Sequence, residues 1–178
     1  CKKLMATQTI KLPPQNIEAE QSLLGALLID QDSVVKIAES MQPGHFYKTE
    51  QHGKIFEAIV ELFEKREPVD LVTVTEQLRQ RSALDIVGGS AYLTTLVNIV
   101  PTSAHVEQYA KIIKEHSLRR SIIAQSTKLV ESAYNEMIPI EDILDSAEQT
   151  IFSLSQSSIK RDFVPIRDIL TISFDRLD

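Results

Sequence analysis

Tryptophan is absent from the 178-residue chain, all aromatic residues together make up 6%, and cysteine occurs once. A single cysteine cannot form an internal disulfide, which fits a reducing compartment. Because large rings are scarce, we expect a hydrophobic core built mainly from Leu, Ile, Val and Ala. Hydrophobic residues still make up 43% of the chain, so the composition predicts a globular protein rather than a disordered one.

The cysteine is Cys1, and it stands shortly before Met5. Met5 is a natural start site for translation, so residues 1–13 are expected to be a disordered tail or a remnant of expression. A reactive Cys1 thiol is the functional alternative.

Positive charge is in deficit, with 19 Lys and Arg against 25 Asp and Glu, a net charge of −6 and a pI of about 5.3. A domain that binds nucleic acid by itself usually has a basic face, because phosphate neutralisation supplies most of the affinity. Autonomous DNA binding and adhesion to an anionic membrane are therefore disfavoured. No apolar run approaches the roughly 20 residues of a membrane span, and no signal peptide is visible. We expect a cytoplasmic protein.

Motifs that carry chemistry are missing as well. No glycine opens the phosphate-binding pattern Gly-x-x-x-x-Gly-Lys-Ser/Thr, and Gly88-Gly89 lacks the strand context of a dinucleotide fingerprint. The histidines lack both the i, i+4 spacing and the neighbouring cysteines of a zinc site; they are His45, His52, His105 and His116.

Acidic pairs such as Glu18 with Glu20 are interpreted as solvated residues or as residues favoured near a helix start. We therefore predict no catalytic residue, no cofactor site, no metal site and no enzyme activity in this chain. The rival hypothesis of a helical enzyme would need His and carboxylate residues gathered in one apolar pocket.

Helical periodicity runs through almost the whole sequence and predicts an all-α fold. A compact domain of orthogonal helices is expected over residues 14–100. Asn16 is expected to cap a first helix that runs to Ile29, and Gly25 within it indicates a close helix crossing. Further expected caps are Asp32 or Ser33, Thr49, Thr73 in a capping box with Glu76, and Ser90 after the Gly88-Gly89 turn.

A different pattern begins after Pro101. Two long helical stripes separated by a short break at residues 135–139 predict an antiparallel helical hairpin over residues 101–156. A hairpin has one internal interface, so its outer apolar residues need another surface, which we expect another chain to supply. Such residues include Ile122, Leu129 and Phe152.

Residues 157–164 are interpreted as a flexible serine-containing linker, and residues 165–178 as a final helix. Its apolar stripe predicts docking on a neighbouring subunit, through Ile166, Ile169, Leu170, Phe174 and Leu177.

Two basic pairs, Arg119-Arg120 and Lys160-Arg161, are interpreted as solvated helix and linker residues. Contact with phosphate or with an acidic partner is the alternative for both pairs. Steeply salt-dependent binding to single-stranded DNA would support it.

Several of these segments together resemble the replicative DNA helicases of the DnaB family. The opening segment Pro13–Ala26, with its Ile-Glu-Ala-Glu-Gln core, is similar to the family signature. Further similar segments follow in the family order: His45-Phe46-Tyr47 with Ile55-Phe56, Pro68–Val74, Gly88–Leu93, Val100–Thr102, Tyr109–Ile113 and Arg119-Arg120. Their common order and spacing make the resemblance specific, and it extends over residues 13–178.

The resemblance implies an N-terminal helical domain, a hairpin that pairs between subunits, a collar of three such pairs and a linker helix on the neighbouring motor domain. The parent protein would be a hexameric, ATP-dependent 5′-3′ helicase that unwinds DNA at the replication fork. ATP, Mg and single-stranded DNA would belong to its motor domain, which lies beyond Asp178. The collar would bind primase and influence the helicase loader.

For this chain we thus predict a non-catalytic module for oligomerisation and for docking of primase or loader, as a dimer or as a hexamer of three dimers. Self-association is assigned to Ile113, Ile123, Leu144 and Ile151. Primase contact is assigned to Tyr92, Ile123, Leu129 and Glu18. The alternative is a stand-alone helical adaptor that resembles a helicase loader.

Overall fold

The computed structural model describes residues 12–100 and 105–159, and every regular element in this part is helical. The absence of strands from these residues confirms the predicted all-α class. In chain order the elements are α1 (Ile17–Ile29), α2 (Asp32–Ile37), the 3₁₀ turn η1 (Pro43–His45), the π turn η2 (Thr49–Gly53), α3 (Lys54–Glu64), α4 (Leu71–Gln80), α5 (Gly89–Ile99), α6 (Val106–Tyr134) and α7 (Ile140–Ile159). The expected helix at 165–178 lies outside the described residues.

The chain divides into two compact units, and the boundary in the sequence falls between Arg120 and Ser121. The first unit extends past the expected boundary near residue 100, because the first part of α6 supplies core residues. Val106, Ala110 and Ile113 recur at helical spacing on that part of α6, and all three are buried.

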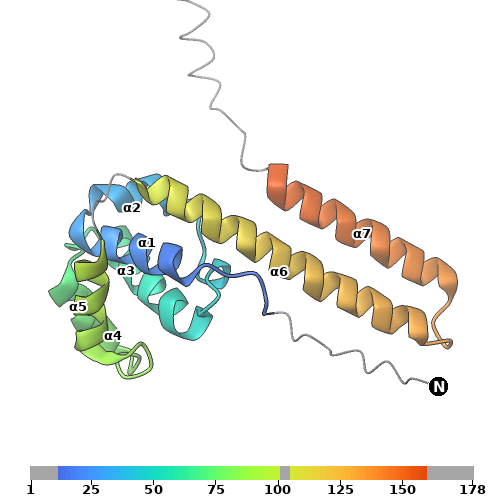
Figure 1. The fold of residues 1–178 in the computed structure, drawn as a ribbon, viewed down its shortest axis with the longest axis horizontal. Helices are drawn as coiled ribbons and strands as arrows, with labels where there is room; N and C mark the ends of the chain where they lie inside the picture. The colour runs from blue at the N-terminus through green and yellow to red at the C-terminus, as the bar shows by residue number, and fades with distance from the viewer. Residues whose placement is uncertain (1–11, 101–104, 160–178) are drawn as a thin grey trace, which may run out of the picture. The chain divides into compact units, whose positions relative to one another are not determined.

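Helix α1 is the centre of the first unit, with α2, α3 and α5 around it (Figure 1). It is buried on nearly all sides, with fully enclosed side chains at Leu23, Leu24 and Leu27. A helix enclosed in this way needs apolar residues around its whole circumference. The run Leu23-Leu24-Gly25-Ala26-Leu27-Leu28 meets this requirement.

The closest approach to α1 comes from α5, at Gly25. A Cβ atom added at Gly25 would overlap the backbone carbonyl of Leu96 and the side chain of Val100. The close helix crossing predicted from the sequence is therefore present, and it requires glycine for space rather than for an unusual backbone angle.

Two helix starts show how the chain sets its boundaries. The Asn16 side chain accepts a hydrogen bond of 2.9 Å from the Ala19 amide, which confirms the predicted cap of α1. The capping box expected at Thr73 and Glu76 is wrong. The cap of α4 is Asp70, whose carboxylate accepts from the amides of Val72 and Thr73, while the Thr73 hydroxyl accepts from the Asp70 amide.

The other expected caps are also displaced. Asp30 accepts hydrogen bonds from the Asp32 amide and from the Ser33 hydroxyl, in place of a cap by Asp32 or Ser33 themselves. Thr49 opens the π turn η2 rather than α3, and Gly88, with φ of 100°, precedes the first residue of α5 where Ser90 had been expected to cap. A positive φ costs little only for glycine, so the backbone turns into α5 there.

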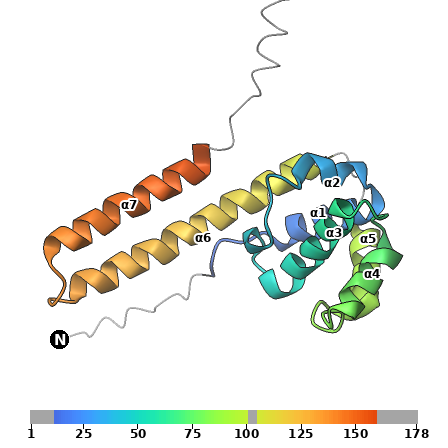
Figure 2. The ribbon, with the colours of Figure 1, turned by 180° about the vertical axis from the view of Figure 1, so that it is seen from behind.

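The second unit contains the remainder of α6 and all of α7, two antiparallel helices joined by a short turn (Figures 1 and 2). In the turn, the Ile138 amide donates to the Asn135 carbonyl, and the Met137 amide donates to the Asn135 side chain. Helix α7 continues to Ile159, so residues 157–159, which were expected to begin the linker, are helical. Serine hydroxyls can bond back to the preceding turn of a helix, as Ser153 does to the Thr150 carbonyl at 2.9 Å.

Replacing Gly25 with alanine should destabilise the first unit, although alanine is the better helix former. The added methyl group has no space against Leu96 and Val100, so we expect a loss of about 1–3 kcal/mol in the free energy of unfolding. Urea unfolding followed by circular dichroism measures the loss. Gly44→Ala is the matched control, because no atom lies within 4 Å of a Cβ at that position. Equal stability of the two variants would contradict the crossing.

Replacing Asp70 with alanine should cost about 1 kcal/mol of stability at neutral pH through loss of the cap. The Thr73 amide, aided by the Val72 amide and the Thr73 hydroxyl, lowers the pKa of Asp70 from its usual 3.8. The unfolded chain therefore binds the proton more tightly, and the charged cap stabilises the fold above pH 3.8. This contribution is lost as the pH falls through the lowered pKa.

Asp70→Asn keeps an oxygen acceptor at the cap but cannot titrate. Its stability relative to the unsubstituted chain should therefore improve as the pH falls from 3.8 through the lowered pKa of Asp70. Thermal unfolding over a pH series measures this, and a constant difference between the two proteins would show that the Asp70 charge does not stabilise α4.

Candidate self-association surface and buried polar cluster

Large apolar side chains are unusually exposed in the second unit. The fractional exposure lies between 44% and 89% for Ile122, Ile123, Val130, Tyr134, Met137, Ile140, Leu144, Ile151 and Phe152. Contiguous apolar surface of this kind marks interaction sites in stable proteins.

On α6 three of the four exposed large apolar residues follow one helical face. Ile123, Val130 and Tyr134 are separated by seven and four residues, so they project from the same side of the helix. Leu129 is half-buried and lies on a different side. An antiparallel pair of helices leaves such an outer stripe uncovered.

Helix α7 repeats the arrangement. Ile140, Leu144 and Ile151 are exposed and recur at four- and seven-residue spacing. Beside them, Ile143 and Ala147 are half-buried. The hairpin therefore has an inner row of half-covered residues and an outer row that is open to solvent.

Three of the four residues predicted for self-association belong to these open rows. Ile123, Leu144 and Ile151 are 52%, 59% and 68% exposed. Ile113 is 2% exposed, because it belongs to the core of the first unit. Ile113 is therefore not available at the surface for self-association.

The residues predicted for primase contact are divided between the two units. Glu18 is exposed on the first turn of α1, and Tyr92 is half-buried on α5. Ile123 and the half-buried Leu129 belong to the second unit. The predicted docking residues of the final helix, and Lys160 and Arg161, lie outside the described part of the chain.

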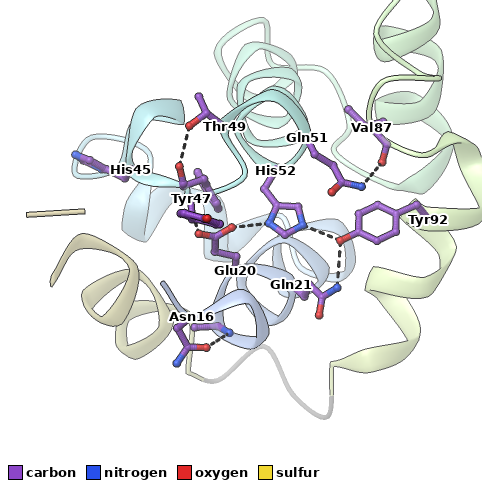
Figure 3. A network of polar contacts seen from close by, with 12 residues as sticks. Asn16, Glu20, Gln21, His45, Tyr47, Thr49, Gln51, His52, Val87 and Tyr92 are labelled. Atoms are coloured by element: carbon purple, nitrogen blue, oxygen red, sulfur yellow. Dashed lines mark hydrogen bonds and ion pairs between the residues drawn. The ribbon is translucent and has the colours of Figure 1, made fainter. Parts of the chain in front are cut away.

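A buried polar cluster connects α1, η2 and α5 within the first unit (Figure 3). Glu20 and His52 are 1% and 0% exposed, and the His52 Nδ1 lies 2.6 Å from the Glu20 Oε2. The other ring nitrogen, Nε2, lies 2.7 Å from the Tyr92 hydroxyl. The second carboxylate oxygen of Glu20 accepts a 2.6 Å hydrogen bond from the Tyr47 amide.

The donors and acceptors of this cluster have one consistent order with a neutral imidazole. A carboxylate can only accept, so His52 Nδ1 carries the proton and donates it to Glu20. His52 Nε2 then accepts from the Tyr92 hydroxyl, and that hydroxyl oxygen accepts from Gln21 Nε2 at 3.1 Å. Each polar group therefore has a partner, as burial requires.

Sequence reasoning missed this cluster, because Glu20 was interpreted as a helix-start or solvated carboxylate and His52 was considered only as a possible metal or catalytic residue. A periodicity signal was present for both residues. Glu20 precedes Leu23, Leu24 and Leu27 by three, four and seven positions, and His52 precedes Ile55, Phe56 and Ile59 by the same steps. Both therefore occupy the inward face of a helical run.

Arg120 is a structural residue of the first unit, in contrast to the solvated or phosphate-binding residue expected. Its guanidinium donates to the carbonyls of Pro14 and His45 and lies 5.7 Å from the centre of the Tyr47 ring. Burial lowers the pKa of Arg120, while the charge of Glu20 and the ionised form of Tyr47 act in the opposite direction. Arg119, next to it, is exposed.

Residues 12–100 and 105–159 contain no group of three or more His, Cys, Asp or Glu that could hold a metal ion. Within the same residues, no helix combines the length and the apolar character needed to cross a membrane.

Replacing His52 with leucine should destabilise the first unit by about 3 kcal/mol, because the buried Glu20 charge loses a hydrogen-bonded partner. Urea unfolding measures the loss, with the exposed His105→Leu as the control. The double variant Glu20→Leu/His52→Leu should lose less than the sum of the two single variants. Additive losses would show that the two side chains stabilise the fold independently.

Comparison with known proteins gives consistent matches. The model of the DnaB-like helicase N-terminal domain family matches residues 12–115. The replicative DNA helicase DnaC of Bacillus subtilis (strain 168) is 40% identical over 168 residues, which are 94% of this chain and 37% of that protein. The replicative DNA helicase DnaB of Geobacillus stearothermophilus is 39% identical over the same fractions. The chain thus spans about a third of the length of these relatives.

Solved structures agree with these matches. The crystal structure of the N-terminal domain of DnaB helicase from Mycobacterium tuberculosis superposes with a TM-score of 0.75 and 36% identity, over 80% of this chain and 99% of that one. A DnaB-like replicative helicase, studied with its interactions with primase, shares the fold with a TM-score of 0.66 at 22% identity, over 80% of this chain and 31% of that one. This chain therefore belongs to the family of DnaB-like helicase N-terminal domains.

Proposed function

We propose that this chain is the non-catalytic self-association and primase-docking module of a replicative DNA helicase. The observation that carries the proposal is the open apolar row on each helix of the second unit, of which Ile123, Leu144 and Ile151 are members. Two helices cannot cover these residues themselves, and burial of apolar surface is the main driving force of association. A second copy of the hairpin offers the same apolar rows and can bury both sets at once.

The parent protein, on this proposal, is a hexameric, ATP-dependent 5′-3′ helicase, and this module contributes to its collar as paired hairpins. ATP and Mg bind the motor domain, as does single-stranded DNA, and this chain holds no cofactor. The proposal is supported by the replicative helicases that match nearly all of this chain over about a third of their own length. The helicase loader and primase are the further partners, and the cytoplasm is the compartment.

Self-association is tested first by the molar mass in solution, measured by light scattering over a range of concentrations. We expect a dimer, or a hexamer of three dimers. Ile123→Asp, Leu144→Asp and Ile151→Asp should each weaken association at least tenfold, or about 1.4 kcal/mol, because a charge would replace buried apolar surface. Val35→Asp is the control, because Val35 is 60% exposed in the first unit. If the unsubstituted chain is monomeric at every concentration, the proposal of self-association is contradicted.

Primase docking is tested by titrating the purified DnaG-type primase into the protein and measuring affinity calorimetrically. Glu18→Ala and Tyr92→Ala test the first unit, and Ile123→Asp and Leu129→Asp test the second. We expect at least one of these pairs to weaken binding about tenfold, while circular dichroism shows an unchanged helical content. The DnaB-like replicative helicase that shares this fold is described together with its interactions with primase, which supports the expectation. Undiminished binding by all four folded variants would exclude these surfaces.

A further inference from the structure

We infer that His52 is a positioning residue for Tyr92. Its hydrogen bond and its parallel ring help to fix the phenol on α5, and so the aromatic contact that α5 offers to primase. This inference rests on the proposed primase docking. It assigns a role to a fully buried histidine that cannot touch a partner itself.

The π turn η2 reaches the start of α5 at two consecutive residues. Gln51 Nε2 donates to the Val87 carbonyl at 3.0 Å, and His52 Nε2 lies 2.7 Å from the Tyr92 hydroxyl (Figure 3). Val87 immediately precedes the Gly88 turn, against which Tyr92 packs, since a Cβ at Gly88 would lie 3.0 Å from the Tyr92 Cβ. One short turn therefore holds both the backbone that leads into α5 and the end of the Tyr92 side chain.

The orientation of the Tyr92 ring is determined by more than one contact. Its hydroxyl donates to His52 Nε2 and accepts from Gln21 Nε2 at 3.1 Å. The ring also lies nearly parallel to the imidazole, with an interplanar angle of 7° and centroids 6.0 Å apart. Since α1 and η2 both contribute, the phenol has little freedom to rotate away from α5.

The imidazole is itself held in one orientation. Glu20 accepts from Nδ1 and thereby leaves Nε2 as the acceptor for Tyr92. Glu20 is held in turn by the Tyr47 amide, and the charge of Arg120 lies close enough to interact with it. The chain of contacts from Glu20 through His52 to Tyr92 thus joins the buried interior to a half-buried residue at the surface.

The surface of α5 makes Tyr92 the residue on which recognition can depend. The exposed residues near it on this helix are small or polar, namely Ser90, Ala91, Thr94 and Thr95. An aromatic side chain with a fixed orientation gives contact area at a low entropic cost, which favours such residues as binding hot spots. A freely rotating ring would have to be ordered during binding.

The test combines His52→Gln and Tyr92→Phe, singly and together, in the full chain, with purified DnaG-type primase as the probe. Tyr92→Phe keeps the ring and removes only the hydroxyl. We expect each single variant to weaken primase binding about fivefold, which is about 1 kcal/mol, and the double variant to be no weaker than the singles. His105→Gln, at an exposed histidine, is the matched control.

A second measurement does not depend on primase. In NMR spectra of protein with ¹³C-labelled tyrosine, His52→Gln should shift the ring resonances of Tyr92 and broaden them, whereas His105→Gln should not. Unchanged Tyr92 resonances would overturn the positioning role, even if stability falls. Affinity losses that add in the double variant would also overturn it, because the two residues would then act separately.

These outcomes separate the two proposals. If the unsubstituted chain does not bind primase while His52→Gln shifts the Tyr92 resonances, the proposed docking fails and His52 still positions the ring. If the unsubstituted chain binds primase and the His52→Gln variant binds equally well, the docking proposal stands and the positioning role in recognition is refuted.

Discussion

The carboxylate of Glu20 is the group on which the first unit depends. A buried charge is tolerated only when its hydrogen-bonding capacity is satisfied, because desolvation costs several kcal/mol per ion. Glu20 recruits the Tyr47 amide and the His52 imidazole for this purpose. Each partner belongs to a different segment from α1. The need to satisfy one carboxylate therefore fixes where the loop at Tyr47 and the turn η2 lie against the central helix.

The two units differ in how completely they bury their apolar residues. In the first unit, α1 is enclosed on nearly all sides, and Gly25 lets α5 approach closely enough to exclude solvent. In the second unit, two helices share one interface, so residues such as Leu144 and Phe152 stay open. The first unit buries its apolar residues within itself, whereas the second leaves large apolar residues open to solvent. This difference in burial is the physical basis of the proposed assembly role.

The sequence predicted the helical class, the cap at Asn16 and the crossing at Gly25, because these follow from local periodicity and from residue size. It misplaced the α4 cap, since Asp70 and Thr73 can both start a helix, and the helix begins at Leu71, three residues earlier than a Thr73 cap would place it. Glu20 and His52 lie 32 positions apart, so their pairing could not be predicted without the tertiary fold. The end of the hairpin was placed too early, at residue 156, because composition favoured a linker from residue 157, whereas α7 continues to Ile159.

Arg120 shows why a basic residue on a helix cannot be assigned to phosphate binding from sequence. Two of its donors bind the carbonyls of Pro14 and His45, and its guanidinium carbon lies over the Tyr47 ring. A phosphate that approached the remaining donors would also face the negative charge of Glu20. Arg119 beside it is exposed and has no such commitment. Of these two adjacent arginines, Arg120 is therefore a structural cation and Arg119 a solvated one. The difference arises from what each side chain packs against.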